Sequence, residues 1–307
     1  MKGRAKRKLV THTLALSLID VVKGKEEFER LQSYWNAYHC QSKVYMVNGR
    51  LHGRYCKNRC CLLCCSIRKA EIINKYFPII DQWEDPHFVT LTARTLSKER
   101  LKKRMQSMLN GLRLICAKYR KQAQRGKGEK LVGIKSLECT YNPKTKKYHP
   151  HLHIIVANKK MADVIVKDWI QMSPTHLVNK KGQYKERVWN KEKALIEIIK
   201  YASKVFTEPD VHNKTKKQCN RPLYAAALDN ILCAMKGLRV FDRFGLNLPK
   251  SKKKEKSSFA TTDYEEYTFT FNARDWLNEP TESKMTGYLA SPSLLNILQN
   301  HIDKESQ

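Results

Sequence analysis

The segment HPHLH at residues 149–153 carries histidines at alternate positions. In an extended strand, successive side chains point to opposite faces, so His149, His151 and His153 share one face. Imidazole nitrogen is a good ligand for divalent metals, and two such groups on one strand can bind the same ion. The spacing therefore predicts a metal site on this strand.

A preceding strand-like segment supplies a third ligand. Residues 131–141 and 148–157 are separated by the turn residues NPKTKK, which predicts a β-hairpin. With the turn centred in this stretch, Glu138 lies opposite the region of His151 and His153. One carboxylate beside two imidazoles leaves coordination positions open for a phosphate oxygen, as metal-assisted phosphate chemistry requires.

Residues 195–206, LIEIIKYASKVF, follow a helical pattern with apolar side chains on one side. Glu197, Tyr201 and Lys204 fall on the other side, and Lys200 flanks them. Nearby ammonium groups favour the phenolate form, which makes Tyr201 a better nucleophile toward phosphorus. Taken alone, without the histidine strand, the segment fits better a tyrosine that packs at a helix edge beside an ordinary Glu–Lys ladder.

Cysteines are concentrated in residues 56–65, where five of ten positions are Cys. Cys61 and Cys64 form a C-x-x-C pair, a spacing that readily chelates Zn²⁺. Nothing at the N-terminus reads as a signal peptide, and no apolar run is long enough for a transmembrane helix, so we expect a cytoplasmic protein. In a reducing cytosol, clustered cysteines indicate metal ligands, with ordinary reduced thiols as the alternative.

The charge of the chain is strongly unbalanced. Lys and Arg number 59 against 29 Asp and Glu, a formal net charge of +30. Such an excess repels itself in the free protein and suits a polyanionic partner such as DNA. Residues 259–307 carry eight acidic and three basic residues, so the positive charge belongs to the part of the chain before them.

Helices and strands that would position these residues alternate along the chain. Helices are expected at residues 25–39, 97–124, 160–172, 191–206 and 222–236, and further strands at 87–92 and 238–244. The pattern predicts an α+β protein with an antiparallel sheet, flanking helices and a small Cys-rich zinc-binding segment. We expect a basic N-terminal region (1–80), a catalytic domain (81–250), and a linker with an acidic tail (251–307).

Together, the motifs resemble the HUH endonucleases, specifically the replication initiators of small rolling-circle plasmids. HFVTLTART at 87–95 resembles the family's first motif, and His151 and His153 match the histidine pair of the second. EIIKYASK resembles the third, in which a Glu precedes the catalytic Tyr by one helical turn. One Tyr at this place is typical of the single-tyrosine class, and the resemblance covers roughly residues 40–245.

The resemblance implies the HUH endonuclease fold and a site-specific endonuclease that cuts one DNA strand. It implies that Mg²⁺ or Mn²⁺ binds His151, His153 and Glu138, and that Tyr201 attacks the scissile phosphate. The products would be a 5′-phosphotyrosine and a free 3′-OH for a polymerase. Glu197 would serve the later, hydrolytic cut that terminates replication. The implied partners are plasmid origin DNA, as a single strand or hairpin, and a host helicase and DNA polymerase.

The family also has a C-x4-C-x2-C segment followed by basic residues. Cys56, Cys61, Cys64 and Arg68 match it, although Leu62 stands where relatives usually have Pro. Cys40 is the expected fourth zinc ligand, and the competing ligands are Cys60, Cys65 and His52. Residues expected to contact DNA are Lys200, Lys204, Arg68 and His149.

Two other readings stay open. One lies within the same chemistry, an HUH transposase or a conjugative relaxase. Relaxases usually place the Tyr near the N-terminus, well before the histidines, whereas Tyr201 follows them here. The other is a non-catalytic, zinc-dependent DNA-binding regulator whose histidines hold only a structural metal.

Overall fold

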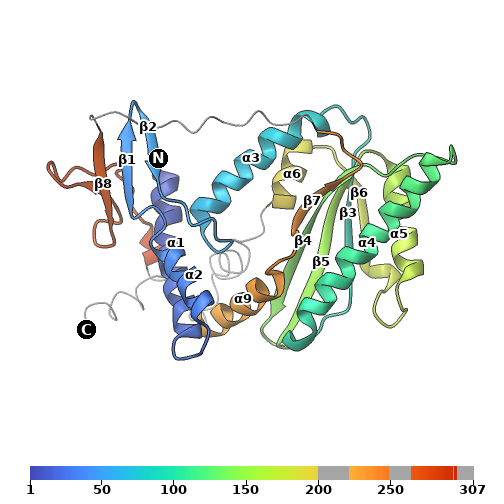
Figure 1. The fold of residues 1–307 in the computed structure, drawn as a ribbon, viewed down its shortest axis with the longest axis horizontal. Coiled ribbons are helices and arrows are strands. Elements are labelled where there is room, and N and C mark those ends of the chain that lie inside the picture. Colours follow the sequence, from blue (N-terminus) through green and yellow to red (C-terminus); the bar gives the residue numbers. More distant parts are fainter. Residues whose placement is uncertain (200–220, 249–263, 293, 296–307) are drawn as a thin grey trace. The chain divides into compact units, whose positions relative to one another are not determined.

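The computed structural model describes residues 1–199, 221–248, 264–292 and 294–295. This part of the chain contains seven α-helices and nine strands, and the strands form two antiparallel sheets (Figure 1). The predicted α+β class, an antiparallel sheet with flanking helices, is therefore confirmed. No helix among the described residues is long and apolar enough to cross a membrane.

The chain forms two compact units. The described parts of the first unit are residues 1–68, 221–226 and the segment from 264 onward, and those of the second are 69–199 and 227–248. Two helices, α3 (Leu62–Ile80) and α9 (Arg221–Met235), contribute residues to both units.

A five-stranded sheet in the order β6–β3–β5–β4–β7 forms the second unit. Its centre is the hairpin of β4 (Gly133–Asn142) and β5 (Lys147–Val156), as expected. The register pairs Glu138 with His151, which confirms the predicted position of Glu138. The outer strands are β3 (His87–Thr92), β6 (Tyr184–Arg187) and β7 (Phe241–Phe244).

Alternation along the strands gives this sheet two different faces. Phe88, Ile134 and Ile155 lie on one face and form a core with Leu195 and Ile198 of α6 (Lys191–Ile199). The opposite face is covered by α4 (Leu101–Gln124) and α5 (Lys159–Met172) (Figure 1). The helix predicted at this place buries an apolar stripe, namely Leu101, Met105, Met108, Leu112 and Ile115.

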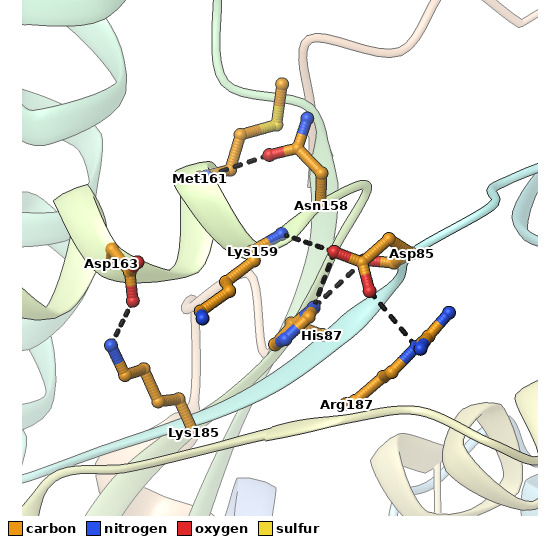
Figure 2. A network of polar contacts seen from close by, with 8 residues as sticks. All are labelled: Asp85, His87, Asn158, Lys159, Met161, Asp163, Lys185 and Arg187. Atoms are coloured by element: carbon orange, nitrogen blue, oxygen red, sulfur yellow. Dashed lines mark hydrogen bonds and ion pairs between the residues drawn. The ribbon is translucent and has the colours of Figure 1, made fainter.

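A polar network ties together β3, β6 and α5 at the start of β3 (Figure 2). The Asp85 carboxylate forms an ion pair with Arg187 Nε at 3.1 Å and accepts a hydrogen bond from the Lys159 backbone N–H at 3.3 Å. Asn158 caps α5 by accepting the Met161 N–H at 2.9 Å. Lys185 of β6 pairs with Asp163 of α5. These contacts fix the edge of the sheet at the opposite end of β3 from Thr92.

The first unit has a four-stranded sheet in the order β2–β1–β8–β9. Its strands are β1 (Lys43–Val47), β2 (Arg50–Gly53), β8 (Glu265–Thr270) and β9 (Asp275–Asn278), and its helices include α1 (Lys2–Val22) and α2 (Phe28–Tyr38).

The C-terminal strands depart from the expected linker and tail over residues 251–307. β8 pairs with β1, and Trp276 of β9 is fully buried against Ala5 and Val44. One edge of β1 pairs with β2 and the other edge pairs with β8. The alternating sequence EEYTFT of β8 fits a strand in this position. The described C-terminal residues are thus part of the N-terminal sheet.

Candidate active site

The predicted metal ligands Glu138, His151 and His153 lie together on the sheet face that α6 covers. His153 Nε2 is 2.9 Å and His151 Nε2 is 3.2 Å from the same oxygen, Glu138 Oε2. The three ligand atoms all lie within 4.8 Å of one another, and the Glu138 side chain is only 4% exposed. This arrangement is suited to a divalent ion, with oxygen and nitrogen donors of the kind that such ions accept.

The ring of His151 shows why a cation fits this group. Its Nδ1 lies 3.0 Å from the carbonyl oxygen of His149, which can only accept a hydrogen bond, so Nδ1 carries the proton. In the neutral imidazole, Nε2 then presents a lone pair to the Glu138 carboxylate, which is also an acceptor. A cation between the two, either a second proton or a metal ion, removes this conflict.

Thr90 of β3 orients the other imidazole, a role that the sequence analysis missed. Its Oγ1 lies 3.1 Å from His153 Nδ1, which leaves Nε2 directed at Glu138. Hydrogen bonds of this kind to the second ring nitrogen are usual for metal-binding histidines. No local pattern in the sequence marks Thr90, because it meets His153 only through the antiparallel register of β3 and β5, which lie far apart along the chain.

His149 lies outside the group of three ligands. Its ring centroid is 5.4 Å from that of His151, and burial together with the nearby His151 lowers the pKa of His149. His149 and Thr92 line a cavity of about 480 Å³, whose other walls include Arg94 and His176. Because Thr92 pairs with His151, this cavity adjoins the candidate metal ligands.

Of the residues predicted on the tyrosine helix, Glu197 is described and half-buried on α6. Tyr201, Lys200 and Lys204 lie outside the described residues. The described part of α6 packs through Leu195 and Ile198 against the sheet face that carries the histidines. Ile199, which is two residues before Tyr201 in the sequence, therefore lies on the sheet face that carries the histidines.

A second group of candidate ligands in the first unit consists of Cys40, Cys56, Cys61 and Cys64, and their sulfur atoms all lie within 4.8 Å of one another. Cys64 Sγ is 3.6 Å from Cys40 Sγ and 3.7 Å from Cys56 Sγ, and it accepts the Lys57 backbone N–H at 3.2 Å. Hydrogen bonds from the neighbouring thiols hold the pKa of Cys64 well below its usual range. Four sulfur atoms that converge in this way fit a tetrahedral zinc site.

The structure brings Cys40 into this group rather than the competing ligands Cys60, Cys65 and His52. Burial raises the pKa of Cys60 to about 12 and that of Cys65 to about 11, which favours their protonated thiols. Cys65 Sγ donates to the carbonyl of Arg59 at 3.1 Å. Arg68 Nη2 donates to the Lys57 carbonyl at 2.9 Å, so this predicted DNA contact also braces the segment around the cysteines.

Lys8 of α1 lies beside the cysteine group and was not singled out in the sequence, where it is one of several basic residues near the N-terminus. Its side chain is fully buried, and Nζ donates to the carbonyls of Tyr38 and Cys40, each at 2.8 Å. Burial lowers the pKa of Lys8 to about 8. An ammonium group in this position offsets the negative charge of the thiolates.

Three curated proteins similar to this chain each bear the name Protein rep. They come from Bacillus amyloliquefaciens, a Bacillus species and Staphylococcus aureus, and each is 30% identical, over 132, 111 and 127 residues. The matches cover 40%, 34% and 39% of this chain. They cover 38%, 34% and 50% of the relatives, so the chain spans half or less of each. No family model and no solved structure matches the chain.

Proposed function

We propose that this protein initiates plasmid rolling-circle replication as an HUH endonuclease of the single-tyrosine class, nicking one DNA strand at an origin. The observation that carries the proposal is the convergence of His151 Nε2 and His153 Nε2 on one oxygen of Glu138. This group shares its sheet face with α6, the helix that directly precedes Tyr201 in the sequence.

In the proposed reaction the phenolate oxygen of Tyr201 attacks the phosphorus of the scissile phosphodiester. The bond between phosphorus and O3′ breaks, the 5′ phosphate stays attached to Tyr201, and O3′ takes up a proton to become a free 3′-OH. Lys200 and Lys204 favour the phenolate because positive charge stabilises the ionised nucleophile. The 3′-OH then serves as a primer.

Glu138, His151 and His153 would hold Mg²⁺ or Mn²⁺. When bound, such an ion supplies Lewis-acid polarisation of a phosphate oxygen. The chain's own contribution is orientation, because Thr90 and the His149 carbonyl fix the two rings from behind. The adjoining cavity, lined by His149 and Arg94, would position the DNA strand beside the reacting phosphate.

The charge of the chain and its relatives both support a DNA substrate. A formal net charge of +30 suits the phosphate backbone. The name Protein rep of the three relatives supports a role in replication. On that basis we propose that the substrate is plasmid origin DNA in the cytoplasm, as a single strand or hairpin. A host helicase and a DNA polymerase would act on the nicked product.

We assign Zn²⁺ to the group Cys40, Cys56, Cys61 and Cys64 as a structural ion. Structural zinc sites are closed, with four protein ligands, and their binding energy contributes directly to folding. Four cysteines within reach of one ion, braced by Lys8, match that description. The ion would fix the segment that carries Arg68, which we assign to contacts with DNA phosphates.

The proposal is tested by incubating the protein with single-stranded origin oligonucleotides and Mn²⁺. The expected product is a covalent protein–DNA species that survives denaturing electrophoresis. Tyr201→Phe should abolish this species while changing DNA affinity by less than about twofold, because only the nucleophilic oxygen is removed.

Tyr184→Phe is the matched control, since Tyr184 is an exposed tyrosine of β6 whose hydroxyl donates to Glu186. It should leave covalent attachment unchanged. DNA binding without any covalent product from the unmodified chain would refute the nuclease and favour a zinc-dependent regulator instead. Covalent attachment that persists in Tyr201→Phe would move the nucleophile elsewhere.

A further inference from the structure

A cavity of about 430 Å³ lies in the second unit between α4, β4 and β7. It opens on the sheet face opposite the metal ligands, because Lys135 in its wall alternates along β4 with Ser136 and Glu138. Apolar side chains form part of its lining, including Leu112 of α4 and Phe244 of β7. The cavity is thus separate from the proposed active site.

Positive charge dominates the lining. Six basic residues contribute to it, namely Arg113, Arg120, Lys130, Lys135, Arg239 and Arg243, against one acidic residue, Asp242. Asp242 pairs with Arg239 at 3.6 Å. Within the described part of the chain, no acidic side chain pairs with the other basic side chains of this set. Six cations that face one cavity repel one another unless an anion enters.

Among these six basic residues, Lys135 gives the strongest argument for an anionic ligand, because its side chain is only 8% exposed. Its Nζ donates to the carbonyl of Arg239. An ammonium group has three N–H donors, and the described residues provide an acceptor for one of them. Burial lowers the pKa of Lys135 to about 8, and the negative charge of nearby Asp242 offsets only part of this effect. A phosphate oxygen would supply both the missing acceptor and the missing negative charge.

The cavity wall is built by close backbone packing. Gly245 has a φ of +69°, and a Cβ at this position would lie 2.1 Å from the Leu131 carbonyl oxygen. Only glycine therefore allows the end of β7 to lie against the segment that enters β4. This contact holds the end of β7, the strand that carries Arg243, beside the segment that enters β4.

The spacing of the basic residues suits a strand of phosphates. Arg113 and Arg120 are seven residues apart on α4, which places them on one face of the helix and about 10 Å apart along its axis. Phosphates of one strand of a duplex recur about every 3.4 Å along the helix axis, so this interval spans about three of them. Exposed Arg239 lies across the cavity from α4.

We propose that this pocket binds phosphate groups of DNA and forms a second DNA-binding surface, on the sheet face opposite the metal ligands. The inference rests on the proposed function in that it takes DNA as the ligand. DNA would then contact both faces of the five-stranded sheet, with the cut strand at Glu138 and flanking duplex at the α4–β7 pocket.

The test compares two triple variants of the full chain that each remove three positive charges. The pocket variant is Arg113→Gln, Arg120→Gln and Arg239→Gln. The control is Lys103→Gln, Lys160→Gln and Lys167→Gln, which are exposed residues of α4 and α5 outside the pocket. Binding to a labelled duplex with a single-stranded arm is followed by fluorescence anisotropy from 50 to 300 mM KCl, without added Mg²⁺ or Mn²⁺. Thermal unfolding confirms that both variants are folded.

In the pocket variant, the negative slope of log K against log[KCl] should become shallower by about 2 to 3, because each lost phosphate contact contributes about −0.9 for duplex DNA. The slope of the control should become shallower by less than about 1. Equal slopes in the two variants would overturn the proposal. So would pocket-dependent binding of ATP or inorganic phosphate with an unchanged DNA slope, because the ligand would then be a free phosphate. Absence of any DNA binding by the unmodified chain would instead refute the proposed function.

Discussion

In each of the two candidate metal-binding histidines, the ring nitrogen that faces away from Glu138 has a different hydrogen-bond partner. His151 donates from Nδ1 to a main-chain carbonyl, which fixes its tautomer, whereas His153 is held by the hydroxyl of Thr90. A hydroxyl can rotate to donate or accept, so the Thr90 contact suits either tautomer of the His153 ring. The affinity of the site for a metal ion can therefore be tuned through the side chain of Thr90.

Thr90→Val should weaken Mn²⁺ binding about tenfold or more, because the contact that orients His153 is lost while the shape of the side chain is kept. Isothermal titration with Mn²⁺ measures the effect. Thr140→Val, on the exposed part of the same hairpin, is the matched control and should bind Mn²⁺ as the unmodified chain does. Equal affinity in both variants would show that Thr90 has no part in the site.

Glu197 lies four residues before Tyr201, one helical turn in the sequence. A carboxylate is a weak base for a phenol because their reference pKa values differ by about 6 units, whereas an attacking water needs a positioned proton acceptor. Glu197→Ala should therefore keep the first cut and the covalent product but fail in the hydrolytic second cut. Replicated DNA should accumulate as products longer than one unit on gels.

Glu197→Gln is the matched companion variant, because it keeps the size and polarity of the side chain while removing the base. It should show the same defect in termination. If either variant loses the first cut as completely as Tyr201→Phe, Glu197 belongs to initiation and the assignment to the second cut is wrong.

Among the elements, β9 supports the backbone next to Cys40, one of the four clustered cysteines. Trp276 is fully buried, and its Nε1 donates to the carbonyl of Gln41 at 2.7 Å. Gln41 follows Cys40 directly and has a φ of +56°, so the backbone at the first zinc ligand is held in an unusual conformation. A strand near the C-terminal end of the described chain thus supports a ligand near the N-terminal end.

Trp276→Ala should lower the free energy of unfolding of the first unit by about 3–5 kcal/mol, the usual cost of removing a buried tryptophan. The zinc content of purified protein should fall with it. Denaturant unfolding and elemental analysis measure the two effects.

Trp189→Ala is the matched control, because Trp189 is 82% exposed and its change should stay within about 0.5 kcal/mol. A Trp276→Ala variant that keeps full zinc content and stability would show that β9 does not support the cysteine group.

The hairpin with its ligands was predictable, and so was a strand at EEYTFT, but the pairing of this strand with β1 was not. A period of two in HPHLH and a short polar turn fix both the face and the register of β4 and β5, so Glu138 follows. The pairing of β1 with β8 depends on contacts far apart in the sequence, which no local pattern encodes. Burial of Lys8 likewise depends on the carbonyls of Tyr38 and Cys40, which meet it only in the folded unit.

At the scale of the whole molecule, the net charge of +30 acts on folding as well as on DNA binding. Like charges on one chain are closer together in the folded state, so their repulsion lowers the free energy of unfolding. Salt screens this repulsion between exposed charges over roughly 8–10 Å at physiological ionic strength. The free protein should therefore gain stability with salt, while its DNA complex weakens.

Raising KCl from 50 to 300 mM should increase the Tm of the DNA-free protein by about 2–4 °C, which corresponds to about 1 kcal/mol for a protein of this size. Differential scanning calorimetry measures the shift. The triple variant of Lys103, Lys160 and Lys167 carries less charge and should show a smaller rise. A Tm that falls with salt would mean that attractive ion pairs outweigh the repulsion.

The pairing of β1 with β8 also has a consequence for biosynthesis. Lys43 lies opposite Thr268, and a ribosome adding 5–20 residues per second needs roughly 10–45 s to make the ~220 residues between them. For most of that interval the four cysteines have already been synthesised, but Trp276 has not. The nascent chain therefore carries an unsupported set of thiols for most of its synthesis, and a product that terminates early never acquires β8 and β9, the strands that complete the sheet of the first unit.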